Sequence, residues 1–97
     1  MYETGNQIAA QKFDKVQVQK LVKTNTFEIL NISLEEGATF PDHTSPTDAQ
    51  LIVLEGAIVF HINGESFQLT KQQNFSFPKE TTHFVVANEN SKFLIIR

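Results

Sequence analysis

A chain of 97 residues has the size of one small domain, and its 40% hydrophobic content predicts a folded core rather than disorder. The formal net charge of −3, with only eight Lys and Arg residues, gives no electrostatic reason to expect a nucleic acid or an anionic membrane as partner. The absence of cysteine excludes a disulfide framework, a thiolate metal ligand and a cysteine nucleophile.

Residues 1–14 are predicted to form an N-terminal arm of the single domain 1–97. They lack the basic start and the continuous apolar stretch of a secretory signal, and no segment reaches the ~20 apolar residues of a membrane-spanning helix. We therefore expect a cytoplasmic location and no membrane partner. A helix around residues 7–13 would be too short to stand alone. In so small a domain the arm would serve best by covering a neighbouring barrel in a homodimer.

From residue 15 onward the apolar residues alternate with polar ones, which is the period of β-strands. Val16 and Val18 share one face of the first predicted strand, and residues 27–34 continue the pattern after a short turn. Asn63-Gly64 predicts a two-residue hairpin, because both central positions of a type I′ turn need a positive φ. Further strands are expected at residues 50–55, 57–62, 66–70, 74–77, 83–87 and 92–97. Many short strands without helical crossovers predict an all-β sandwich or barrel.

The segment GATFPDHTSPTDAQLIVLEG, residues 37–56, resembles the first motif of the cupin family: Gly, five residues, His-x-His, three or four residues, Glu, six residues, Gly. The spacing is intact, and His43 occupies the first histidine position. Ser45 stands at the second, and the glutamate position falls on Ala49, or on Gln50 with the longer spacer.

The segment QQNFSFPKETTHFVVAN, residues 72–88, is similar to the second cupin motif: Gly, five residues, Pro-x-Gly, two residues, His, three residues, Asn. Pro78 and His83 are kept, Gln72 and Glu80 replace the two glycines, and Asn88 lies one residue beyond its position. The resemblance covers essentially the whole chain.

The resemblance implies a double-stranded β-helix, or jelly-roll barrel, that forms a homodimer. It also implies a metal site inside the barrel, for which the family supplies three histidines and one glutamate. Only His43 and His83 remain here, with Gln50 as a third, neutral donor. Two imidazoles without a carboxylate hold zinc, nickel, iron or manganese weakly, since stable zinc sites usually have at least three protein ligands.

A small-molecule pocket is predicted beside the two histidines, because an apolar wall with a few polar groups is the usual lining of such a site. Its residues share the strand parity of the histidines, apart from the neighbouring Gln50: Ser45, Ala49, Gln50, Leu51, Val53 and Val85. The sequence thus favours a barrel that binds a small molecule without tight metal binding, as a sensor or accessory subunit. Two alternatives stay open: a metal-dependent oxygenase or isomerase that uses His43 and His83, and an interaction protein with a filled lumen.

The remaining polar residues give weaker indications. His61 lies on the strand face opposite Ile58, Phe60 and Ile62, as expected for a surface or interface histidine. Asp42 and Asp48 have the opposite parity to His43, so no paired-carboxylate site is predicted. The chain has no nucleophile elbow and no phosphate-binding glycine loop. The identity of a catalytic residue is therefore left open.

Overall fold

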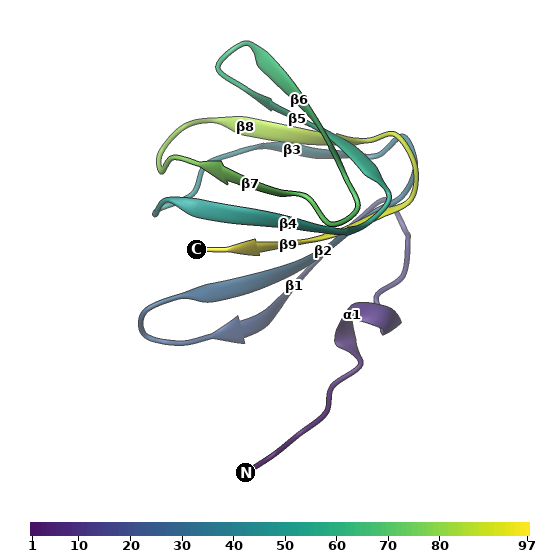
Figure 1. Cartoon of the computed structure of the whole chain (residues 1–97), viewed down its shortest axis with the longest axis vertical. Coiled ribbons are helices and arrows are strands. Elements are labelled where there is room, and N and C mark those ends of the chain that lie inside the picture. Colours follow the sequence, from purple (N-terminus) through teal and green to yellow (C-terminus); the bar gives the residue numbers. More distant parts are fainter.

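The computed structural model describes all 97 residues and consists almost entirely of strands (Figure 1). In chain order the elements are α1 (Gln7–Ala10), β1 (Val16–Lys23), β2 (Glu28–Leu34), β3 (Thr39–His43), β4 (Ala49–Glu55), β5 (Ala57–Ile62), β6 (Glu65–Thr70), β7 (Asn74–Phe77), β8 (His83–Ala87) and β9 (Ser91–Ile96).

The strands form two antiparallel sheets that face each other (Figure 1). One has five strands in the order β1-β2-β9-β4-β7, and the other has four in the order β3-β8-β5-β6. The last strand, β9, lies between β2 and β4, so the chain closes on segments far away in the sequence. This arrangement confirms the predicted all-β double-stranded β-helix.

Alternation along the strands places one face of each sheet in a common core. In β4, residues 49, 51 and 53 are buried while the residues between them reach the surface. The core cluster contains 15 buried hydrophobic residues, and its bulkiest fully buried members are Phe60 and Phe93. Burial of this apolar surface is the main term that stabilises the barrel.

Several turns between strands contain residues with a positive φ. Asn63 and Gly64 have φ values of 54° and 73°, which is the left-handed pair that the hairpin between β5 and β6 requires. Gln72 and Glu80, the residues that replace the two glycines of the second motif, also have positive φ values of 72° and 58°. Both positions therefore have the left-handed backbone that glycine adopts most easily.

The N-terminal arm lies against the outer face of the five-stranded sheet of its own chain, and its first residues extend away from the barrel (Figure 1). Met1 and Tyr2 are fully exposed, and α1 buries none of its four residues. No helix is long and apolar enough to cross a membrane.

Candidate functional site

The two histidines of the motifs meet at one end of the four-stranded sheet. His43 is the last residue of β3 and His83 the first of β8, and the two are register partners across these strands. The register shifts between Phe40 and His43, where an irregularity in β3 interrupts the ladder. The fold thus joins residues that are 40 positions apart in the sequence.

The ring nitrogens of the pair are held in a specific orientation. The Nδ1 atoms lie 2.7 Å from the carbonyl oxygen of Pro41 for His43, and 2.9 Å from that of Thr81 for His83. The two Nε2 atoms face each other at 2.8 Å. A carbonyl oxygen only accepts, so each Nδ1 must carry a hydrogen, and the Nε2 atom of each neutral ring then presents a lone pair.

These three short contacts require three hydrogens, but two neutral imidazoles carry only two. Either the pair takes up one further proton, or a cation lies against the two lone pairs. Burial lowers the pKa of both imidazoles and outweighs the opposite effect of their backbone hydrogen bonds. The neighbouring His43 and then Arg97 lower the pKa of His83 further, while at His43 the effect of Arg97 is opposed by that of Asp42. The additional proton is therefore costly near neutral pH.

Aromatic rings enclose the pair on its inner side. His83 is 1% exposed and stacks on Phe60 at 5.1 Å between ring centroids, with Phe77 at 4.6 Å. His43 is half-buried and stacks on Phe40 at 4.2 Å. Phe75 contacts Phe60 and is partly buried against the core. The histidine pair therefore has a packed aromatic floor, and His43 is its connection to the surface.

The residues predicted to line a pocket face the interior, but they are packed there. Leu51, Val53 and Val85 are almost completely buried and belong to the core cluster. Ala49 also belongs to the core and, with its neighbour Gln50, borders a shallow hollow beside β7. The structure brings these aliphatic residues into one cluster, which is a core and not an open cavity.

Two of the predicted polar residues do not join the histidines. Gln50 is exposed on the other face of β4, and its Nε2 donates a hydrogen bond to Ser76 Oγ at 2.6 Å. Ser45 is buried, and its hydroxyl donates to the carbonyl oxygen of Thr47 at 2.6 Å. Neither residue supplies a third donor next to the pair.

His61 lies outside the site. Its ring stacks on Phe84 at 4.3 Å with an interplanar angle of 7°, and both side chains are half-buried on the outer side of the four-stranded sheet. Asp48 is exposed and accepts a hydrogen bond from the backbone N–H of Lys79. These placements agree with the strand parity read from the sequence.

The sequence did not indicate that Arg97 acts on the histidine pair or that Glu28 holds this arginine in place. Glu28 is 8% exposed, and its Oε2 accepts a hydrogen bond from Arg97 Nε at 2.6 Å, while Lys20 and Lys23 approach its Oε1 to 3.6 and 3.8 Å. The ion pair fixes the guanidinium whose charge acts on both imidazoles. Glu28 lies at the edge of its strand, and only the pairing of β2 with β9 brings the two ends together.

Two convergent imidazole nitrogens fit a borderline metal such as zinc or nickel, although they fill only part of its coordination shell. The structure contains no group of three or more His, Cys, Asp or Glu side chains that could hold a metal ion. A divalent cation would also be opposed by the charge of Arg97. The donor set therefore fits weak metal binding, in which exogenous ligands complete the coordination.

Comparisons with known proteins agree with this fold. The structure is similar to an RmlC-like cupin protein from Desulfovibrio desulfuricans, with 22% identity, a TM-score of 0.87, and coverage of 99% of this chain and 95% of the other. It is also similar to a conserved protein of unknown function from Streptococcus pyogenes, SPY1581, with 26% identity, a TM-score of 0.78, and coverage of 88% and 75%. KdgF from a Halomonas species shares 24% identity at a TM-score of 0.76, with coverage of 89% and 81%.

No curated protein matches the chain. The family model described as "Cupin domain" matches residues 31–96, which include both histidines and all strands from β3 onward. The chain is therefore a small member of the cupin family.

Proposed function

We propose that this protein is a non-catalytic binding module that takes a small anionic molecule at the His43–His83 pair, assisted by a weakly held divalent transition metal. The observation that carries the proposal is that the two Nε2 atoms lie 2.8 Å apart while the Nδ1 atom of each ring contacts a backbone carbonyl oxygen. This arrangement lacks one hydrogen, and a metal ion satisfies both lone pairs without it.

An anionic ligand suits the charge around the pair. Arg97 lowers the pKa of both imidazoles, whereas the carboxylate of Asp42 acts on His43 alone and forms no hydrogen bond or ion pair with its ring. A metal held by two neutral nitrogens keeps its full positive charge, so a carboxylate ligand would both complete the coordination and offset that charge. Metal and anion should therefore bind more tightly together than either does alone.

The direct test is metal titration of the untagged chain by calorimetry at pH 7.5, with zinc and then nickel, in the absence and presence of oxalate as a dicarboxylate probe. We expect one metal per chain, weak binding by the metal alone, and tighter binding with oxalate. Affinity should fall as the pH is lowered, because protons compete for the same Nε2 lone pairs.

His43→Gln and His83→Gln should each abolish the binding, whereas His61→Gln, at the third histidine of the chain, should leave it unchanged. Thermal unfolding of each variant would verify that the barrel is intact. Equal metal uptake in the unmodified chain and His43→Gln, or no uptake by the unmodified chain at millimolar metal, would refute the proposal.

The packing of Phe60, Phe75 and Phe77 beneath the pair supports a second candidate, an interaction protein whose barrel interior is purely structural. In that case neither zinc nor oxalate would bind to the unmodified chain or to His43→Gln. The calorimetric experiment therefore distinguishes the two functions.

A further inference from the structure

A positively charged cluster surrounds Glu28 where β1 turns into β2. Arg97 Nε donates a hydrogen bond to Glu28 Oε2 at 2.6 Å, and the ammonium groups of Lys20 and Lys23 lie 3.6 and 3.8 Å from Oε1. Three cations thus face one carboxylate, which leaves an excess of two positive side-chain charges in a chain whose net charge is −3. An α-carboxylate at Arg97 would reduce this excess to one, so the cluster stays positive.

A hollow of about 230 Å³ opens beside this cluster. Its walls are the β1–β2 turn (residues 24–27), Pro46 and Thr47 of the β3–β4 loop, and the side chains of Lys23 and Arg97. Figure 1 shows the turn, the loop and the C-terminus at the same end of the barrel. Neither histidine of the pair lines the hollow. Its volume lies below the ~300–1,000 Å³ of pockets for drug-sized molecules, which suits a small ion or a single charged group.

Several hydrogen-bond donors of this hollow have no partner within the chain. A guanidinium has five N–H groups, and only the Nε–H of Arg97 is used, so the four on its Nη atoms are free. Solvent reaches them, since the only buried side-chain polar atom without a partner is Asn31 Oδ1. The side-chain amide of Asn25 and the hydroxyl of Thr47 also line the hollow without an internal hydrogen bond. Paired N–H groups of this kind match two oxygens of a carboxylate or phosphate.

The walls of the hollow are fixed by hydrogen bonds of the chain itself. Glu28 and Arg97 exchange two backbone hydrogen bonds, of 2.7 and 3.0 Å. In the turn, Thr24 Oγ1 accepts hydrogen bonds from the backbone N–H groups of Thr26 and Phe27, and it donates one to the carbonyl oxygen of Phe27. Groups that are already ordered lose less entropy when a ligand binds, so this arrangement favours binding.

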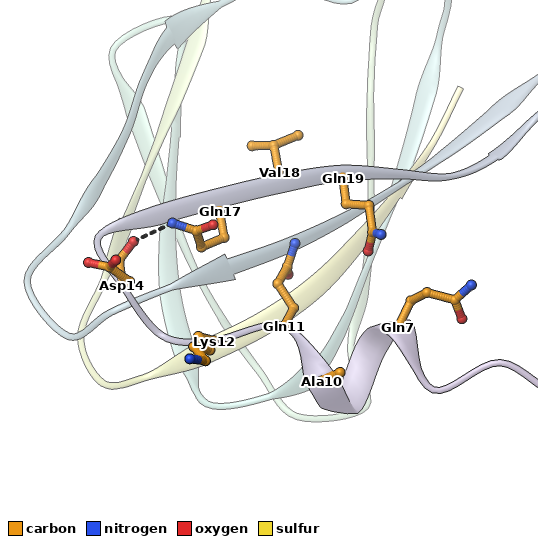
Figure 2. Close-up of a pocket in the computed structure, with 8 residues that line it drawn as sticks. All are labelled: Gln7, Ala10, Gln11, Lys12, Asp14, Gln17, Val18 and Gln19. Carbon is orange, nitrogen blue, oxygen red and sulfur yellow. Dashed lines mark hydrogen bonds between the residues drawn. The ribbon is translucent and has the colours of Figure 1, made fainter.

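Charge distinguishes this hollow from a larger groove on the same molecule. A groove of about 460 Å³ lies between the N-terminal arm and β1 (Figure 2). Its lining is mainly glutamine, and its two charged residues, Lys12 and Asp14, have opposite signs. Figure 2 places both on the segment that leads from α1 to β1. The larger groove therefore has no charge that would select an anion, although it also contains a lysine.

We propose that the hollow is an oxyanion-binding site, in which Arg97 and Lys23 hold a phosphate or carboxylate group of a small ligand. The Nη atoms of Arg97 donate to two oxygens, Lys23 adds another charge-assisted hydrogen bond, and the donors of Asn25 and Thr47 complete the contacts. Glu28 is a positioning residue, because it fixes the Nε side of the guanidinium and leaves the Nη side free. This inference goes beyond the proposed function, since the site requires neither the histidine pair nor a metal ion.

Titration of the full-length chain with inorganic phosphate tests the proposal. Metal is removed on a chelating resin, and the NMR signals of the backbone amides and the arginine side chain are followed in Tris buffer at constant ionic strength. We expect saturable shifts at Arg97 Nε, residues 24–27 and Thr47, with a Kd of about 1 mM. Sodium chloride should cause no saturable shift. Acetate is the carboxylate probe: whichever of phosphate and acetate binds more tightly identifies the class of group that the site takes, and either result supports an oxyanion site.

Two substitutions remove cations from the hollow, and two matched controls remove cations elsewhere. Arg97→Gln and Lys23→Gln should each weaken phosphate binding about tenfold, because each removes a charge-assisted hydrogen bond. Lys20→Gln removes a cation from the same carboxylate without removing a residue of the hollow, and Lys12→Gln removes one from the larger groove. Both controls should change the affinity less than about threefold, since exposed charges at a distance are screened.

Equal weakening by Lys20→Gln and Lys23→Gln would overturn the proposal, because the anion would then respond to the general charge of the cluster and not to contacts in the hollow. Shifts centred on His43 and His83, or equal responses to phosphate and chloride, would also overturn it. If Arg97→Gln unfolds the barrel, the exposed Lys23 still provides the decisive variant. The proposed function is measured separately, by metal uptake, so the two ideas can fail independently.

Discussion

Gly56→Ala is the substitution for which the structure makes the sharpest energetic prediction. Gly56 lies between β4 and β5 with a φ of 89°, and a Cβ atom there would be 2.3 Å from Ser91 Oγ, 2.4 Å from the carbonyl oxygen of Asn90 and 2.6 Å from Ser91 Cα. Two of these three atoms belong to the backbone, so they cannot rotate away. The backbone must shift, and the hydrogen bond from the Ala57 N–H to Ser91 Oγ at 3.0 Å is disturbed with it.

The expected cost is the sum of two effects. A left-handed residue with a side chain costs about 1–2 kcal/mol, and disturbing a buried hydrogen bond costs about 1–3 kcal/mol. Gly56→Ala should therefore lower the free energy of unfolding by about 2–5 kcal/mol, before any additional cost of moving the backbone. Gly37→Ala and Gly64→Ala are matched controls, because both glycines have positive φ but a Cβ there would meet no atom within 4 Å.

Urea unfolding followed by far-ultraviolet circular dichroism would measure all three variants. The controls should lose only about 1–2 kcal/mol each. If Gly56→Ala were no less stable than Gly64→Ala, then the close approach of β9 to the turn would not be the reason for glycine at this position.

Three further predictions concern other parts of the molecule. The hydrogen bond from Arg97 lowers the pKa of Glu28 below its ordinary value of 4.5, so the folded chain binds fewer protons than the unfolded chain. The resulting stabilisation is present above about pH 4.5 and is lost as the pH falls through the pKa of the folded state. Glu28→Gln should flatten this part of a curve of unfolding free energy against pH. Lys92→Met should release the arm, seen as faster tryptic cleavage after Lys12, with little change in the unfolding midpoint of the barrel. Phe60→Ala should lower the free energy of unfolding by about 3–5 kcal/mol in urea denaturation, because the ring contacts both His83 and the core.

The strand pattern of this fold could be predicted from the sequence because its signals are local. Alternating apolar residues and the Asn63-Gly64 pair each act over a few residues, and the structure confirms them. The proximity of His43 and His83 was predicted from the spacing of the two motifs, and in the structure the two residues are register partners. Whether they bind a metal stays a prediction.

Other features depend on three-dimensional packing that no local pattern reports. The parity of β4 put Leu51 on the inner face, but the size of the space left there depends on how Phe60, Phe75 and Phe77 pack from other strands. A lysine is usually exposed, but Lys92 is buried in the structure, where its Nζ donates to the carbonyl oxygen of Gln11 in the arm.

The left-handed backbone at Gln72 and Glu80 has a consequence for the recognition of distant relatives. A sequence motif that requires glycine at these two positions does not match this chain. Both turns are nevertheless formed, by residues that adopt a positive φ less readily than glycine. Restoring glycine at either place should relieve local strain without altering the path of the chain. At these two turns of the barrel the left-handed torsion angle is present without glycine.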